Sequence, residues 1–208
     1  MQGLWAIRWL LAAVTLLQVG VLTSVPCRAA DVGAPAPPVA APAPVLLPNP
    51  YRYEVRFGAF AHGVGGVESG TVDLNGEFVF PRLPFAQDQW WNFFIPRPHV
   101  GGMVNLSGRT SYVYGGALWT IPLWQGIFAE GFFDGAVHDG SRFGTPTQAA
   151  LGCNPLFHAG GSLGYALTQR WSVMFTFDHI SNGNNTFGTD CVRNQGLNNY
   201  GGRIGFSF

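Results

Sequence analysis

The sequence contains no lysine, so its eleven basic residues are all arginines, and eleven Asp and Glu residues balance them. Charged residues make up only 11% of the chain, against roughly 25% in a typical soluble domain. So little charge would not cover the surface of a soluble cytosolic enzyme. The balanced charge also lacks the basic excess that nucleic-acid binding requires. Composition therefore argues against both classes of protein.

Long apolar runs are missing as well, except at the N-terminus. Residues 1–29 begin with a positive charge at Arg8, continue with an apolar stretch over residues 9–22, and end beside the small residues Ala29 and Ala30. This order is typical of a secretory signal peptide with its cleavage site. We therefore predict export of the chain, with an uncleaved N-terminal membrane anchor as the alternative.

The Pro/Ala-rich stretch over residues 30–50 is predicted to be an extended linker, because it offers no face for packing. A lipoprotein site at Cys27 is disfavoured by the preceding Pro26. Nowhere after the signal do roughly 18 consecutive apolar residues occur, so no helical membrane span is expected there. The folded part is therefore placed at residues 51–208.

Residues 51–208 alternate between apolar and polar side chains with the period of two that is typical of β-strands. Turn-forming residues such as Gly, Asn and Pro separate eight segments of this kind. The predicted strands cover residues 51–62, 67–80, 98–107, 110–121, 127–138, 156–167, 170–181 and 197–208. No amphipathic helix of useful length is predicted between them.

Two kinds of barrel fit this alternation. A soluble, lipocalin-like binding barrel would place the apolar face inside, whereas a membrane barrel places it against lipid and keeps charges in a packed interior. The low charge favours the membrane barrel, as do the pairable numbers of arginines and carboxylates on the polar face. The aromatic terminus Phe206, Ser207 and Phe208 is typical of outer-membrane barrels. We predict an all-β fold, an eight-stranded antiparallel transmembrane β-barrel of the bacterial outer membrane.

Only three cysteines are present, and signal cleavage removes Cys27. If both ends of the barrel are periplasmic, residues 168–170 form a periplasmic turn. The outer loops are then residues 62–66, 107–110, 140–155 and 182–196. Cys153 and Cys191 fall on the last two of these loops, in an oxidising compartment. A disulfide between them is therefore predicted.

The histidines divide between the two faces of the predicted strands. The polar inward face carries His62, His99, His138 and His158. These lie on separate strands without the spacing of metal ligands, so neither a metal site nor a cofactor is predicted. The exception is His179, which continues the outward, lipid-facing row of its strand. An imidazole in that position is costly unless it is used or lies at headgroup level.

Ser181 is the next member of the outward row that contains His179. Residues two apart on a strand share a face and lie about 7 Å apart. Asn198 belongs to the outward set of the neighbouring last strand, across the hairpin from the pair. A hydroxyl, an imidazole and a third polar group are the parts of an acyl-transfer site. A site facing the outer leaflet would meet a lipid ester, whereas rim residues that only contact headgroups are the alternative.

The sequence around these residues resembles the lipid A 3-O-deacylases (PagL type). The resemblance rests on residues 178–182 (Asp-His-Ile-Ser-Asn), on residues 194–200 (Asn-Gln-Gly-Leu-Asn-Asn-Tyr), and on the aromatic C-terminus. Members of that family are eight-stranded outer-membrane barrels with a His-x-Ser-Asn motif on the barrel wall. The resemblance implies hydrolysis of an ester-linked acyl chain of lipid A, at the 3-O position, in the outer leaflet of lipopolysaccharide.

The resemblance also implies roles for individual residues. Ser181 would be the nucleophile and His179 the general base. Asn182 and Asn194 match family asparagines near the site, where they could help stabilise an oxyanion. No cofactor is implied. The oligomeric state is left open, a homodimer included.

One position departs from the family pattern. The family's third catalytic residue is a Glu that orients the histidine, and Asn198 occupies its place. An Asn can accept a hydrogen bond from the imidazole but cannot offset its positive charge, and the corresponding change in serine proteases costs roughly 10⁴ in rate. Asp190 could replace the Glu if its loop folds back, whereas Asp178 points inward. A non-catalytic barrel acting in envelope stability or adhesion is therefore the rival hypothesis.

Overall fold

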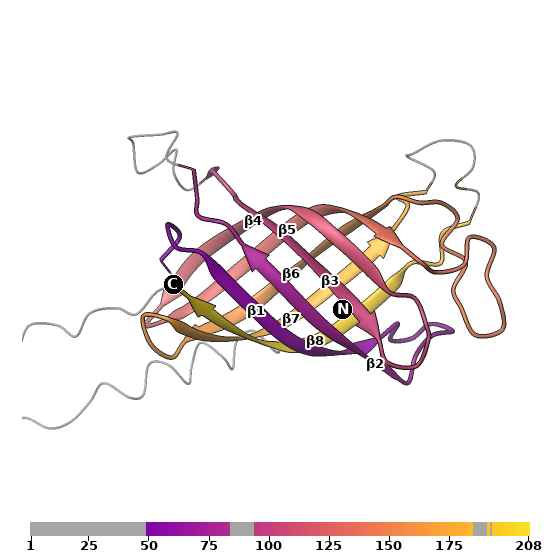
Figure 1. The fold of residues 1–208 in the computed structure, drawn as a ribbon, viewed down its shortest axis with the longest axis horizontal. Coiled ribbons are helices and arrows are strands. Elements are labelled where there is room, and N and C mark those ends of the chain that lie inside the picture. The colour runs from indigo at the N-terminus through magenta and orange to yellow at the C-terminus, as the bar shows by residue number, and fades with distance from the viewer. Residues whose placement is uncertain (1–48, 84–93, 185–190, 192) are drawn as a thin grey trace, which may run out of the picture. The chain divides into compact units, whose positions relative to one another are not determined.

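A computed structural model describes residues 49–83, 94–184, 191 and 193–208 of the chain. The predicted signal peptide and nearly all of the predicted linker lie outside these residues. The described chain forms a closed barrel in which sequential strands are neighbours and β8 pairs with β1 (Figure 1). Its strands are β1 (Glu54–His62), β2 (Thr71–Val79), β3 (Arg97–Asn105), β4 (Tyr112–Trp124), β5 (Ile127–His138), β6 (Leu156–Ala166), β7 (Trp171–Ser181) and β8 (Leu197–Ser207). No helix within the described ranges is long and apolar enough to span a membrane.

All eight predicted strands occur, all pairs are antiparallel, and β5 has the predicted bounds. The predicted fold class is therefore confirmed. The second strand begins later than predicted, because Gly70 has a φ of +86° that belongs to a turn. β4 continues to Trp124 instead of ending at Ile121. A register shift between Pro122 and Trp124 accommodates the proline, which has no N–H to donate to the ladder.

The outward face of the barrel is apolar. Phe57, Phe175 and Ile204 expose 68%, 62% and 54% of their surface, respectively. Inward polar residues are covered almost completely, with Arg56 at 1% and Glu130 at 6% exposure. This is the inverse of a soluble protein and the arrangement that a bilayer-spanning barrel requires.

Ion pairs fill much of the interior. The Arg56 guanidinium contacts Glu54 at 2.8 Å, Glu77 at 3.1 Å and Glu130 at 2.8 Å. Arg203 contacts Glu77 from another strand at 3.0 Å. Buried charges are tolerated only when they are paired and hydrogen-bonded. The network therefore explains how the inward face can hold so much charge in a packed interior.

Phenylalanine rings also share this interior, among them Phe60, Phe128 and Phe132. The alternation of polar residues did not identify them. Glycines on neighbouring strands provide their space. A β-carbon at Gly164 would overlap the Phe128 ring, and one at Gly201 would overlap the Phe60 ring. The interior is thus a mixed core of ion pairs and rings.

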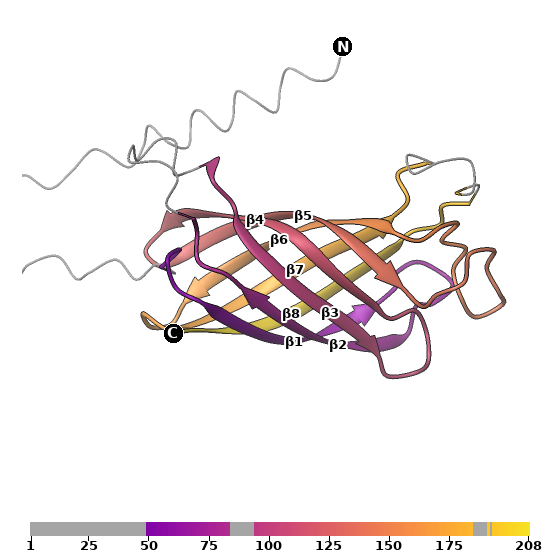
Figure 2. The same ribbon diagram turned by 45° about the horizontal axis from the view of Figure 1, so that its top comes forward.

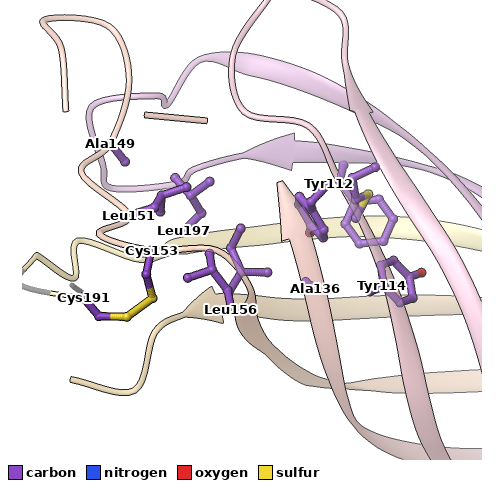
Figure 3. Close-up of a cluster of buried hydrophobic side chains, with 12 residues drawn as sticks. Tyr112, Tyr114, Ala136, Ala149, Leu151, Cys153, Leu156, Cys191 and Leu197 are labelled. Atoms are coloured by element: carbon purple, nitrogen blue, oxygen red, sulfur yellow. A yellow bond between two sulfur atoms is a disulfide. The ribbon is translucent and has the colours of Figure 1, made fainter. Parts of the chain in front are cut away.

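The β1–β2, β3–β4, β5–β6 and β7–β8 connections leave the barrel at one end, which we call the outer end, and Phe208 lies at the other (Figures 1 and 2). The predicted disulfide is confirmed: Cys153 and Cys191 join the β5–β6 and β7–β8 connections with an S–S distance of 2.05 Å (Figure 3). Glu68 of the β1–β2 connection accepts hydrogen bonds from the backbone N–H groups of Thr110 at 2.8 Å and Ala149 at 2.7 Å. All four connections are therefore linked into one outer cap.

Candidate active site

His179 and Ser181 lie at the outer end of β7. Both side chains are partly exposed, and they continue the outward row of that strand. The alternating residues Asp178, Ile180 and Asn182 are buried on the other side. The pleat of a single strand therefore presents an imidazole and a hydroxyl side by side on the outer wall of the barrel.

Asn198 of β8 stands directly opposite His179 in the strand register. Its Oδ1 atom lies 2.7 Å from Nδ1 of the imidazole. An amide oxygen only accepts hydrogen bonds, so this contact places the ring proton on Nδ1. Nε2 then keeps its lone pair. In this tautomer, the histidine can accept a proton from a hydroxyl at Nε2.

The structure contains no hydrogen bond between the His179 ring and the Ser181 hydroxyl. The two side chains share the outward face of β7 and occupy adjacent positions in its outward row. A contact between base and nucleophile is often longer before substrate binds, so shared position is the informative observation. The structure thus places a hydroxyl beside an imidazole that a third side chain orients, an arrangement that nucleophilic catalysis can use.

Apolar side chains surround this polar group. On β6, Phe157 stands opposite Ser181, and Ala159 stands opposite His179. Toward the middle of the barrel, the rings of Phe177 and Tyr200 pack with their centroids 5.0 Å apart. The site therefore faces the apolar exterior and not the barrel interior.

The two asparagines predicted near the site lie against the outer cap. The buried side-chain amide of Asn182 donates to the backbone carbonyls of Leu151 and Arg193. Its backbone N–H donates to Oδ1 of Asn194 at 3.1 Å, and Asn194 is exposed at the rim. No local sequence pattern indicates that Asn182 also holds two loops. Asp190, the predicted alternative partner of the imidazole, lies outside the described residues.

The remaining histidines have other partners. His62, His99 and His158 are buried, and each contacts a carboxylate inside the barrel. His138 is partly exposed, and its Nε2 lies 2.8 Å from the carbonyl oxygen of Cys153. Within the described part of the chain, no group of three or more His, Cys, Asp or Glu side chains could hold a metal ion. His179 is therefore set apart from the other four by both its face and its partner.

A hollow of about 510 Å³ lies on the same outward wall, nearer the opposite end of β7. Its lining includes Ile127, Leu163, Tyr165, Val173 and Phe175. Ser181 lies six positions along β7 from Phe175, which corresponds to about 20 Å of strand. The hollow is therefore separate from the polar group at the rim.

The profile of the lipid A 3-O-deacylase (PagL) family matches residues 86–207, more than half of the chain. The chain belongs to this family. The matched range includes His179, Ser181 and Asn198. It also includes Asn182 and Asn194. The resemblance inferred from a few motif residues is therefore confirmed over a far longer stretch. No curated protein sequence matched the chain.

Several solved structures align with the chain. The crystal structure of the outer membrane enzyme PagL aligns with a TM-score of 0.51 and 16% identity, covering 74% of this chain and 99% of that chain. A de novo designed transmembrane β-barrel aligns with a TM-score of 0.46 and 12% identity, covering 76% of this chain and 97% of that chain. The N-terminal barrel domain of Pseudomonas aeruginosa OprF aligns with a TM-score of 0.42 and 8% identity, covering 76% of this chain and 98% of that chain. At 16% identity, the PagL alignment supports the barrel fold alone.

Proposed function

We propose that this protein is an outer-membrane lipid A deacylase that hydrolyses the acyl ester at the 3-O position. Ser181 acts as the nucleophile and His179 as the general base. The observation that carries the proposal is the outward imidazole whose Nδ1 lies 2.7 Å from Asn198, two residues from an outward serine. Family membership supports lipid A as the substrate. The position of the site supports it as well, because a site on the wall between apolar side chains suits an ester that stays in the membrane.

The proposed reaction follows the acyl-transfer pattern of serine hydrolases. Nε2 of His179 accepts the proton as Oγ of Ser181 attacks the ester carbonyl carbon. The tetrahedral intermediate then collapses, the bond to the sugar oxygen breaks, and His179 returns the proton to that oxygen. Water attacks the resulting acyl-enzyme in the same way and releases a free fatty acid. Asn198 keeps the ring in the required tautomer throughout.

The oxyanion role of Asn182 and Asn194 stays a prediction. The side-chain amide of Asn194 is exposed and donates to Oδ1 of Asn184 at 3.2 Å, a contact that a substrate oxygen can replace. The side-chain amide of Asn182 already donates to two backbone carbonyls. We therefore assign the direct contact with the oxyanion to Asn194, and the support of its position to Asn182.

The mass of lipid A from cells with and without this chain tests the proposed function. Expression is expected to remove one hydroxyacyl group from lipid A, and the Ser181→Ala variant, made at equal level, is expected to leave lipid A intact. Lipid A of the same mass in cells with and without the wild-type chain would refute deacylation. That result would favour the non-catalytic barrel, which the replacement of the family's Glu by Asn198 independently suggests.

A further inference from the structure

Gly196 lies at the start of β8, close to the His179 ring. The last paired residues of the β7–β8 hairpin are Ile180 and Leu197, so the next step places Ser181 opposite Gly196. A β-carbon built on Gly196 would lie 2.8 Å from Cε1 and 3.4 Å from Nε2 of the imidazole. The first distance is too short for any real side chain, so this backbone position is open to glycine alone unless the ring moves.

The two sides of the imidazole therefore have different neighbours. Nδ1 is held by Oδ1 of Asn198 at 2.7 Å, while the Cε1–Nε2 edge occupies the space that a β-carbon on Gly196 would need. The hydrogen bond selects the tautomer, and the missing side chain at position 196 leaves room for this orientation of the ring. Together they direct Nε2 toward the level of the barrel at which Ser181 stands.

The position of Gly196 is in turn set by the β5–β6 connection. The N–H of Ala150 donates to Oε1 of Gln195 at 2.6 Å, and the N–H of Gln195 donates to the carbonyl of Ala150 at 3.1 Å. The Cys153–Cys191 disulfide joins the same two connections. Gly196 also has a φ of +59°, the left-handed conformation that glycine adopts most easily. Gly196 therefore lies between Gln195, which is bonded to the β5–β6 connection, and Leu197, which pairs with Ile180 in the β7–β8 ladder.

We propose that Gly196 is a positioning residue of the active site, and that Gln195 and the β5–β6 connection hold it against the His179 ring. The general base is then oriented by the outer cap as well as by Asn198. This inference rests on the proposed function for its kinetic consequence, but the position of the ring can be measured without it.

Gly196→Ala compared with Gly108→Ala is the first test. Gly108 also lies in an outer connection with a positive φ, +71°, but a β-carbon there has no neighbour within 4 Å. Both variants carry similar backbone strain, and only Gly196→Ala displaces the imidazole. We expect kcat for deacylation to fall by about 10²-fold in Gly196→Ala, the cost of a small misplacement of a catalytic group. KM is expected to stay the same, and Gly108→Ala to keep the wild-type rate. Equal losses in the two variants would overturn the proposal.

Gln195 provides a second pair of variants without steric conflict or backbone strain. Gln195→Ala removes the acceptor for the Ala150 N–H and is expected to lower kcat, whereas Gln195→Glu keeps an acceptor oxygen and is expected to restore it. A Gln195→Ala variant that keeps the wild-type rate would overturn the role of Gln195 and the β5–β6 connection.

The NMR signal of the His179 Cε1–H group, assigned by its absence in His179→Gln, measures the contact directly. It is expected to shift in folded Gly196→Ala and to stay in place in Gly108→Ala. An unchanged signal in Gly196→Ala would overturn the positioning role. A wild-type protein that hydrolyses no lipid A would instead refute the proposed function, while this spectroscopic comparison would still decide the position of the ring.

Discussion

At the scale of single residues, the bond between His179 and Asn198 separates two functions that one carboxylate usually combines. The amide oxygen selects the Nδ1 tautomer and aims the ring, as the 2.7 Å contact shows. In the proposed reaction, it offers no negative charge to stabilise the imidazolium that would form when Ser181 loses its proton. The proposed site therefore has an oriented base but lacks part of the electrostatic stabilisation of the transition state.

Ser181→Ala and His179→Ala are each expected to abolish deacylation while the barrel stays folded. Both side chains face outward, so their loss removes little packing. Because nucleophile and base act as one unit, either single loss should cost nearly as much as both, on the order of 10⁶ in a serine hydrolase. Rates with purified lipid A should be compared for wild type, both single variants and the double variant. Additive partial losses, or an active Ser181→Ala, would show that these residues are not the catalytic pair.

Asn198→Glu is expected to raise the rate of deacylation. The position already faces Nδ1 of His179, so a carboxylate there needs no change in the backbone and stabilises the charged ring. The gain is bounded by roughly 10⁴, the cost of the opposite change in serine proteases. Gln195→Glu serves as the matched control, because it adds the same charge at the rim without facing Nδ1. Equal effects of the two variants would point to a general effect of charge.

At the scale of the elements, the outer cap depends on one carboxylate, Glu68. Burial opposes its ionisation, but hydrogen bonds from His62, from Thr110 and from the backbone N–H of Ala149 outweigh this and lower the pKa of Glu68 from 4.5 to about 2. The carboxylate thereby links three of the four outer connections. The fourth, the β7–β8 connection, is held by the disulfide. Each connection is therefore joined to another by the disulfide or by a hydrogen bond to the Glu68 carboxylate.

The cap is expected to loosen in acid before the barrel does. Because the folded-state pKa of Glu68 lies below its ordinary value, the carboxylate stabilises the cap above pH 4.5, and this stabilisation is lost as the pH falls toward about 2. Amide exchange at Thr110 and Ala149, corrected for the intrinsic rate, should accelerate over this range. Glu68→Gln should show the faster exchange already at neutral pH. Protection that is independent of pH in the wild type would contradict this role.

The strands and the site could be predicted from sequence to different degrees. Alternation is local, so it located every strand and placed His179 and Ser181 on one face. It also placed Phe133 on the outward face, where the side chain is exposed, but it did not single out Phe132, which is apolar and buried inside the barrel. The ties of the cap join residues far apart in the chain: Glu68 is separated from Thr110 by 42 positions and from Ala149 by 81. Such contacts, like that of Gly196 with the imidazole, depend on loop paths that no local pattern encodes.

At the scale of the whole molecule, a closed ladder of strands surrounds a core of paired charges. Every strand has two neighbours, so the barrel has no free edge from which to unravel. The apolar outer surface favours detergent or lipid over water, while the ion pairs inside are shielded from solvent. Unfolding therefore has to open the ladder and expose the charged core together.

The protein is accordingly expected to be heat-modifiable. In detergent, the folded barrel should migrate differently on a gel before and after boiling, because the closed ladder resists unfolding until heated. Circular dichroism should report β-structure in the unboiled sample. Identical migration in both states, or a helical spectrum, would contradict the barrel.

Under the proposed function, the outward position of Ser181 and His179 also determines how the substrate arrives. A molecule bound for this site does not pass through a channel or dissolve in water, but diffuses laterally within its own leaflet until it meets the wall. The encounter is two-dimensional, so the quantity that sets the rate is the mole fraction of substrate in the membrane, not its bulk concentration. Diluting the substrate with inert lipid or detergent should slow the reaction, even when the amounts of enzyme and substrate in the tube are unchanged.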